Sequence, residues 1–206
     1  MHPLWSTIFG NDAPVEVEIG PGTGTFILTA AAESPDVNFY GVEHSRARAA
    51  RLQDAIRTRG LANARVINGD AACVVSALLP AACVRAYHVY FPDPWWKRRH
   101  YRRRLFTPAF AAALARTLVA GGQVHIATDV EETFALILQT LGQCGPFWRD
   151  GVRAPRRNGL TAFERKGLAR GALIHEATFV KSGEELPVRR FHASSAAPIT
   201  PSESPS

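Results

Sequence analysis

Short apolar runs alternate along most of the chain with longer amphipathic stretches. This alternation constrains the fold more than any other feature of the 206 residues, because it is typical of an α/β domain with a mostly parallel central sheet and helices on both faces. The runs that predict strands are 15–19, 37–43, 64–70, 84–91, 123–129 and 174–180. The stretches that predict helices are 25–33, 45–59, 71–79 and 130–141, together with a short helix near Phe163 and a longer one that begins after Thr107 and stops at Gly121 and Gly122.

The length corresponds to one large domain rather than two. We expect a short N-terminal segment over residues 1–14 and the α/β domain over residues 15–192. In residues 193–206, eleven of the fourteen positions are Ala, Ser or Pro. That composition cannot bury a core, so it predicts a disordered tail.

Several classes of protein are disfavoured by simple features of the sequence. Cys73, Cys83 and Cys144 are odd in number and form no C-x-x-C pair, which argues against a disulfide framework and a structural zinc site. The seven histidines show no metal-binding spacing, so we expect no metal. The apolar stretch 71–84 is too short to span a bilayer, and the N-terminus lacks the pattern of a signal peptide. We therefore expect a cytoplasmic protein without a membrane partner, either a monomer or a homodimer.

Positive charge is concentrated in one run, KRRHYRRR at 97–104, which holds six basic residues and no acid. Outside this run, 18 basic residues match the 18 acidic residues of the chain, so the net charge of +6 comes from one local patch. Such a patch indicates a polyanion that docks at one place. The neighbouring Trp95, Trp96 and Tyr101 are candidates for stacking on an exposed base.

A glycine-rich turn follows the first predicted strand, with Gly20, Gly22 and Gly24 in the spacing G-x-G-x-G. Glycines let a backbone approach a ligand closely and adopt positive φ. The third glycine of the dinucleotide motif G-x-G-x-x-G would fall at Thr25, so this turn does not specifically indicate a pyrophosphate on a helix N-terminus.

Acidic residues stand at the ends of the first three predicted strands, where ligands bind in sheets of this kind. Glu43 is placed to accept hydrogen bonds from ribose hydroxyls, and Asp70 to bind an adenine amino group or to fix the loop beside it. Glu18 could hold the amino end of an amino-acid-bearing nucleoside. Three acids suit a cationic ligand such as S-adenosylmethionine and would repel the phosphates of NAD or ATP.

The fourth predicted strand runs into FPDPWW, in which Pro92 and Pro94 restrict the backbone on either side of Asp93. A rigid carboxylate beside an aromatic pair and a basic run predicts an edge that binds a base, with a phosphate cradle next to it.

At this point the sequence resembles the bacterial-type tRNA (guanine-N7)-methyltransferase family. The matching segments are VEIGPGTG, GVEHS, NGDA, FPDPWWKRRHYRRRLF, the ATD at 127–129 and TAFERKG at 161–167, and they span about residues 15–180. The resemblance implies a Rossmann-like class I S-adenosylmethionine-dependent methyltransferase fold. It also implies transfer of a methyl group from S-adenosylmethionine to N7 of a variable-loop guanosine in tRNA.

The resemblance also assigns roles to residues, with Asp93 as the catalytic residue. The donor would be bound by Glu18, Gly20, Gly22, Glu43, Asp70 and Asp93. The target nucleotide would contact Lys97, Asp129, Thr161, Ala162, Phe163 and Glu164. Arg99, His100, Tyr101, Arg102, Arg103 and Arg104 would lie along the RNA, and a second basic stretch at 153–170 would form the opposite wall of the cleft.

Two departures from the family pattern leave alternatives open. Ala162 stands where the family usually has Lys, and only fourteen residues precede Val15, where relatives usually carry a longer basic segment. An RNA-binding paralogue with little or no methyl transfer is therefore one alternative. A dinucleotide-dependent oxidoreductase is another, based only on the glycine-rich turn and Glu43.

Overall fold

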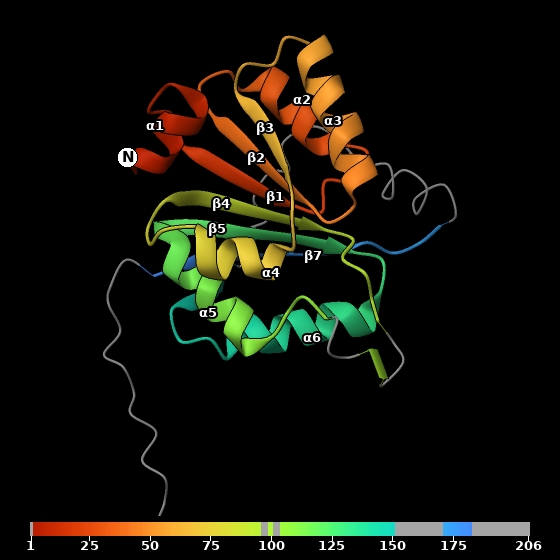
Figure 1. Cartoon of the computed structure of the whole chain (residues 1–206). Helices are drawn as coiled ribbons and strands as arrows, with labels where there is room; N and C mark the ends of the chain where they lie inside the picture. Colours follow the sequence, from red (N-terminus) through yellow and green to blue (C-terminus); the bar gives the residue numbers. More distant parts are fainter. Residues whose placement is uncertain (1, 96–98, 101–103, 151–170, 183–206) are drawn as a thin grey trace, which may run out of the picture.

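The computed structural model describes residues 2–95, 99–100, 104–150 and 171–182. Within these residues the strands form a single seven-stranded sheet with helices on both faces (Figure 1). The strands are β1 (Val15–Ile19), β2 (Asn38–Glu43), β3 (Ala64–Asn68), β4 (Val84–Tyr90), β5 (Leu118–Thr128), β6 (Phe147–Asp150) and β7 (His175–Lys181). The helices are α1 (Pro3–Phe9), α2 (Thr25–Glu33), α3 (Arg46–Thr58), α4 (Ala71–Cys73), the π-helical turn η1 (Val74–Leu78), α5 (Pro108–Thr117) and α6 (Glu131–Gly142).

The strand order is β3-β2-β1-β4-β5-β7-β6, and the pairs among β1 to β5 are parallel, whereas β7 is antiparallel to both of its neighbours. This arrangement confirms the predicted class, a mostly parallel sheet with helices on both faces. The order reverses direction between β1 and β4. Ligands of open α/β sheets bind at such a switch point, beyond the carboxyl ends of the strands.

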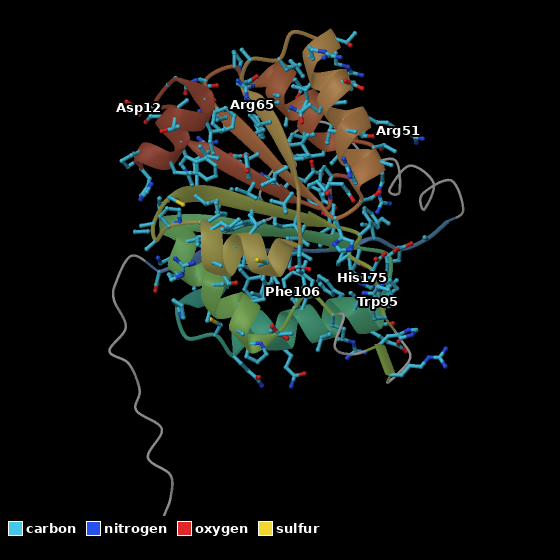
Figure 2. All side chains as sticks on the ribbon, in the orientation of Figure 1. Asp12, Arg51, Arg65, Trp95, Phe106 and His175 are labelled. Carbon is cyan, nitrogen blue, oxygen red and sulfur yellow. The ribbon has the colours of Figure 1, made fainter. Side chains whose placement is uncertain are left out.

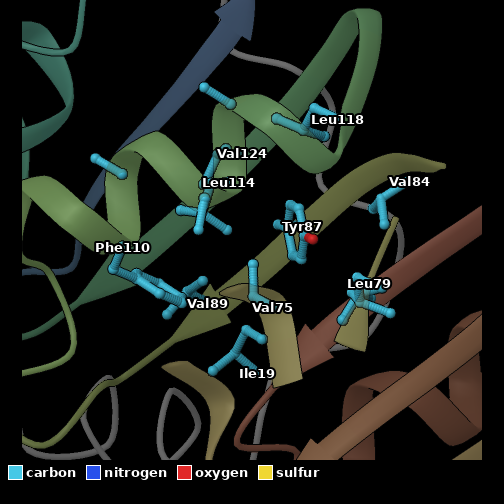
Figure 3. Packing of buried hydrophobic residues seen from close by; sticks show 14 of the residues in the cluster. Ile19, Val75, Leu79, Val84, Tyr87, Val89, Phe110, Leu114, Leu118 and Val124 are labelled. Carbon is cyan, nitrogen blue, oxygen red and sulfur yellow. The ribbon is translucent and has the colours of Figure 1, made fainter. Parts of the chain in front are cut away.

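Two apolar clusters lie on opposite faces of the sheet. One packs α2 and α3 against the sheet, and the other packs α4, η1, α5 and α6 against it. Figure 3 shows the second cluster, in which Phe110 and Leu114 of α5 and Val75 of η1 surround Tyr87 and Val89 of β4.

Helix α1, which the sequence analysis did not predict, belongs to this second cluster. The side chain of His2 caps its first turn, and Pro3 takes a position where no backbone N–H is needed. The indole of Trp5 is fully buried and donates a hydrogen bond of 2.6 Å to the carbonyl of Cys83. The segment that precedes β1 is therefore part of the core.

The structure corrects two of the predicted helices. Helix α5 ends at Thr117 rather than at the glycine pair, and the chain passes directly into β5. Gly121 and Gly122 lie inside β5, where the register against β4 shifts between Val84 and Ala86. The predicted helix 71–79 is divided into a single turn of α-helix and the π-helical turn η1.

Replacing Gly24 with alanine is expected to destabilise the fold. Gly24 has a φ of +78°, and an added Cβ would overlap the side chain of Leu52 in α3. We expect the free energy of unfolding to fall by about 2 kcal/mol or more, measured by urea denaturation. The matched control is Gly142→Ala at the end of α6, where the space is open. An equal loss in both variants would contradict this account.

Candidate functional site

The carboxyl ends of the parallel strands share one edge of the sheet. Figure 2 shows Arg51 of α3, Trp95 after β4 and His175 at the start of β7 on the same side of the molecule. His175 pairs with Thr128, the last residue of β5, so this side is the edge where the parallel strands end. The predicted acids Glu18, Glu43, Asp70, Asp93 and Asp129 all lie at or just beyond strand ends on this edge.

The glycine-rich turn between β1 and α2 has the conformation that its glycines predict. Gly20, Gly22 and Gly24 have φ values of +71°, +57° and +78°. The N–H of Gly20 donates to the carbonyl of Val42 at 2.9 Å, and that of Gly24 to the carbonyl of Pro21 at 2.7 Å. The first bond holds the turn against the end of β2, beside the switch point, and the second closes the turn itself.

Glu43, the last residue of β2, is buried and holds this turn in place. One carboxylate oxygen accepts a 2.9 Å hydrogen bond from the N–H of Gly22. The other oxygen accepts from the N–H of Ser45 at 2.8 Å and from Nε of Arg48 at 3.2 Å. A carboxylate offers about four acceptor positions, so these three bonds leave one for a hydroxyl donor of a ligand. Glu43 is thus mainly a structural residue of the turn that can still accept one further hydrogen bond.

Glu18 differs from Glu43 because its side chain is buried without full hydrogen bonding. It is 5% exposed, and its Oε2 has no hydrogen-bond partner among the described residues. The pKa of its carboxyl is raised to about 8, mainly by burial; the N–H of Ile27 opposes the rise, and the nearby charge of Glu43 adds to it. This carboxyl oxygen is buried beside a glycine-rich turn and accepts no hydrogen bond from the described residues. Such an oxygen fits a cationic group that donates hydrogen bonds, such as an ammonium.

Asp70 and Asp129 are both exposed at this edge. Asp70 caps helix α4, since its Oδ1 accepts a 2.9 Å hydrogen bond from the N–H of Cys73. Of the two roles expected for Asp70, this geometry supports the one in which it fixes the loop after β3. Asp129 directly follows β5, the strand next to β4.

The loop that carries Asp93 has an unusual backbone. Phe91 and Trp95 have positive φ values of +52° and +33°, which non-glycine residues rarely adopt. The N–H of Phe91 donates to the carbonyl of Ala127 at 2.7 Å, which ties the start of the loop to β5. Strained residues of this kind cluster at functional sites.

Asp93 is exposed and lines a pocket with Arg104 and with the first two turns of α6. The pocket is lined by Pro92, Asp93, Pro94, Arg104, Leu105, Phe106, Glu132, Thr133, Leu136 and Ile137. The structure therefore brings together the proposed catalytic carboxylate and the last arginine of the basic run.

Only part of the basic run is described. Arg99 is exposed and donates from Nε to Nε2 of His100 at 3.3 Å, and the His100 ring lies edge-on to Trp95 at 5.4 Å. Other predictions lie outside the described residues. These are the roles of Trp96, Lys97, Tyr101, Arg102, Arg103, Thr161, Ala162, Phe163 and Glu164, the helix near Phe163, the basic stretch at 153–170 and the tail at 193–206.

A buried polar group that was not predicted from the sequence is formed by Glu16 of β1 and His88 of β4. Both residues are 3% exposed, and their side chains are joined by a hydrogen bond of 2.9 Å. The available signal was a charged residue in the middle of a central strand, since such a residue is rarely buried unless it is paired.

In the described parts of the chain, no helix is long and apolar enough to cross a membrane. No group of three or more His, Cys, Asp or Glu side chains in these parts is arranged to hold a metal ion. Cys73, Cys83 and Cys144 are free thiols.

A family model described as "Putative methyltransferase" matches residues 12–177. A tRNA (guanine-N(7)-)-methyltransferase from Verminephrobacter eiseniae is 38% identical over 175 residues, which are 83% of this chain and 64% of that protein. One from Paraburkholderia xenovorans is 35% identical and one from Halorhodospira halophila is 36% identical, over 88% and 84% of this chain and 71% and 77% of those proteins.

Solved structures support the fold alone, because their sequence identities are low. The 16S rRNA methyltransferase KamB has a TM-score of 0.64 at 13% identity, with 88% of this chain and 94% of that chain covered. TrmN from Thermus thermophilus has a TM-score of 0.59 at 17% identity, with 87% of this chain and 47% of that chain covered. Both share the class I methyltransferase architecture of the sheet described above.

Proposed function

The chain belongs to the tRNA (guanine-N7)-methyltransferase family, and from this premise we propose that it transfers a methyl group from S-adenosylmethionine to N7 of a guanosine in tRNA. The observation that carries the proposal is Glu18, a buried carboxyl with an oxygen that lacks a partner among the described residues, at the end of β1 beside the glycine-rich turn. The curated relatives favour this function over the RNA-binding paralogue and the oxidoreductase.

The donor site would use residues that the structure places at the ends of β1, β2 and β3. Glu18 would pair with the ammonium group of the donor, and the backbone of Gly20 and Gly22 would allow its close approach. Glu43 would accept a hydrogen bond from a ribose hydroxyl while it holds the turn, and Asp70 would contact the adenine side. Bound S-adenosylmethionine supplies a methyl group on a positively charged sulfur.

Asp93 would orient the guanine and stabilise charge, rather than remove a proton. N7 of guanine carries a lone pair and no hydrogen, so its attack on the methyl group requires no general base. Positive charge passes from sulfur to the purine during transfer, and a fixed carboxylate at the guanine edge stabilises that charge. The restricted backbone around Asp93 holds the carboxylate in place before the substrate arrives.

The RNA side of the proposal rests mainly on the family resemblance. Lys97, Asp129 and residues 161–164 would contact the target nucleotide, and residues 99–104 would follow the RNA backbone. Arg104 lines the same pocket as Asp93, and Asp129 follows β5 at the same edge of the sheet, which agrees with these roles. With tRNA as substrate and three free thiols, we further propose that the protein works in the cytoplasm.

The proposal is tested by incubating the protein with unmodified tRNA and S-adenosylmethionine labelled in its methyl group. We expect label in the RNA. We also expect the protein to bind S-adenosylmethionine in the absence of tRNA, as measured by calorimetry. Binding of tRNA without incorporation of label would instead support the RNA-binding paralogue.

Replacing Arg99 with alanine is expected to weaken tRNA binding and its dependence on salt. Each neutralised phosphate releases counterions, so the slope of log affinity against log salt should fall by about one. The measurement is a salt titration of tRNA affinity by filter binding. Arg57→Ala is the matched control, since Arg57 is also exposed but is paired with Asp54 near the end of α3. Equal slopes in the wild-type protein and in Arg99→Ala would argue against this contact.

A further inference from the structure

A chain of hydrogen bonds, buried at Glu16 and His88 and half-buried at Arg85 and Tyr90, crosses β1 and β4. Arg85 donates to Oε1 of Glu16 from its Nε at 3.0 Å and its Nη2 at 2.5 Å, and Oε2 of Glu16 lies 2.9 Å from Nε2 of His88. Nδ1 of His88 lies 3.0 Å from the hydroxyl of Tyr90. Because a carboxylate only accepts, Nε2 of His88 carries a proton, and in the neutral imidazole Nδ1 then accepts from the Tyr90 hydroxyl.

The ring of Phe26 links this chain to the glycine-rich turn. Its centroid lies 4.5 Å from that of His88 and 5.1 Å from that of Tyr90. Phe26 is the second residue of α2 and follows Gly24 by two positions, whereas Tyr90 is the last residue of β4, three positions before Asp93. The rings of Phe26, His88 and Tyr90 therefore form one cluster that links two parts of the proposed site. These are the glycine-rich turn, where the methyl donor would bind, and the Asp93 loop, where the guanine would bind.

We propose that His88 is a positioning residue for methyl transfer, which holds Tyr90 and Phe26 so that the glycine-rich turn and the Asp93 loop keep a fixed separation. This inference rests on the proposed function. Transfer requires the nucleophile, the methyl group and the sulfur to lie in line, and small misplacements of such groups lower the rate steeply. His88 is suited to this role because Glu16 fixes its ring, and the ring in turn fixes the Tyr90 hydroxyl.

The inference is tested with Tyr90→Phe, which removes only the hydroxyl, and with His88→Gln, which keeps a donor toward Glu16 but offers no acceptor at the Nδ1 position. We expect kcat to fall about tenfold in each, with the donor dissociation constant changed by less than about twofold. Because both variants break the same link, the double variant should be no slower than the slower single variant.

Tyr87→Phe is the matched control. Tyr87 lies on the same strand but points into the opposite cluster, where its buried hydroxyl is 2.7 Å from Oγ1 of Thr117. This variant should lose stability and keep the wild-type kcat. Wild-type kcat in Tyr90→Phe, or an equal loss of kcat in Tyr87→Phe, would overturn the inference.

Hydrogen exchange provides a readout that does not depend on turnover. In Tyr90→Phe, but not in Tyr87→Phe, we expect faster exchange at the N–H of Phe91 and in the first turn of α2. Unchanged exchange there would overturn the positioning role, even if the wild-type protein transferred no methyl group. Absence of transfer by the wild-type protein would by itself count against the proposed function alone.

Discussion

Asp93→Ala is expected to lower the kcat of methyl transfer about a hundredfold or more, because it removes a fixed charge that stabilises the developing positive charge. The dissociation constant of the methyl donor should change by less than about threefold, since its ground-state contacts would come mainly from residues at the ends of β1, β2 and β3. The measurements are single-turnover transfer to tRNA and calorimetric titration of S-adenosylmethionine.

Asp36→Ala serves as the control for this experiment. Asp36 is an exposed aspartate that precedes β2, so it lies at the opposite edge of the sheet from Asp93. Its replacement should leave both quantities unchanged. If Asp93→Ala lowered kcat and donor affinity by the same factor, Asp93 would be a structural residue of the loop rather than a catalytic one.

Glu18→Gln is expected to weaken donor binding about a hundredfold, because it removes the charge that pairs with the donor ammonium group in a buried site. In the wild-type protein the affinity should also fall as the pH drops below about 8, since the Glu18 carboxyl, whose pKa is raised to about 8, must lose its proton to form the pair. Titrations of Glu18→Gln should show no such pH dependence. Identical pH profiles in the two proteins would exclude Glu18 as the titrating group.

The same pKa shift predicts an opposite effect on the stability of the protein without donor. The pKa of Glu18 is higher in the folded state than the ordinary value of 4.5, so the folded protein binds more protons than the unfolded chain between about pH 4.5 and 8. Its stability therefore falls as the pH rises through this range. At pH 8 to 9, Glu18→Gln should melt at a higher temperature than the wild-type protein, a gain in stability with a loss of function.

Regular patterning predicted most of the fold. The predicted strand 15–19 and helix 25–33 have the bounds that the structure gives them, and the predicted helices near 45–59 and after Thr107 begin where Ser45 and Thr107 cap α3 and α5. The end of α5 was wrong because glycines also occur where a strand bulges, and local sequence does not distinguish that from a helix stop. Helix α1 was missed because its Trp5 is stabilised by tertiary contacts that no local pattern reports.

The position of the site was predictable from the sequence, but the burial and the hydrogen-bond partners of its carboxyl groups were not. Strand-end acids and the glycine spacing located it, because parallel strands bring their carboxyl ends to one edge. The alternation in VEVEI would ordinarily predict one solvent-facing side, yet every residue of β1 is buried. Glu16 is compensated by Arg85 and His88, whereas Glu18 is left without a full set of partners among the described residues. That difference depends on residues distant in sequence, so only the structure reveals it.

The most direct test of the proposed function identifies the methylated nucleoside. After transfer from labelled S-adenosylmethionine, the tRNA is digested and its nucleosides are separated, in parallel with tRNA that carries 7-deazaguanosine in place of guanosine. Label in 7-methylguanosine, and none in the 7-deaza substrate, is the result that this account predicts. Label in another nucleoside, or undiminished label in the 7-deaza substrate, would contradict it.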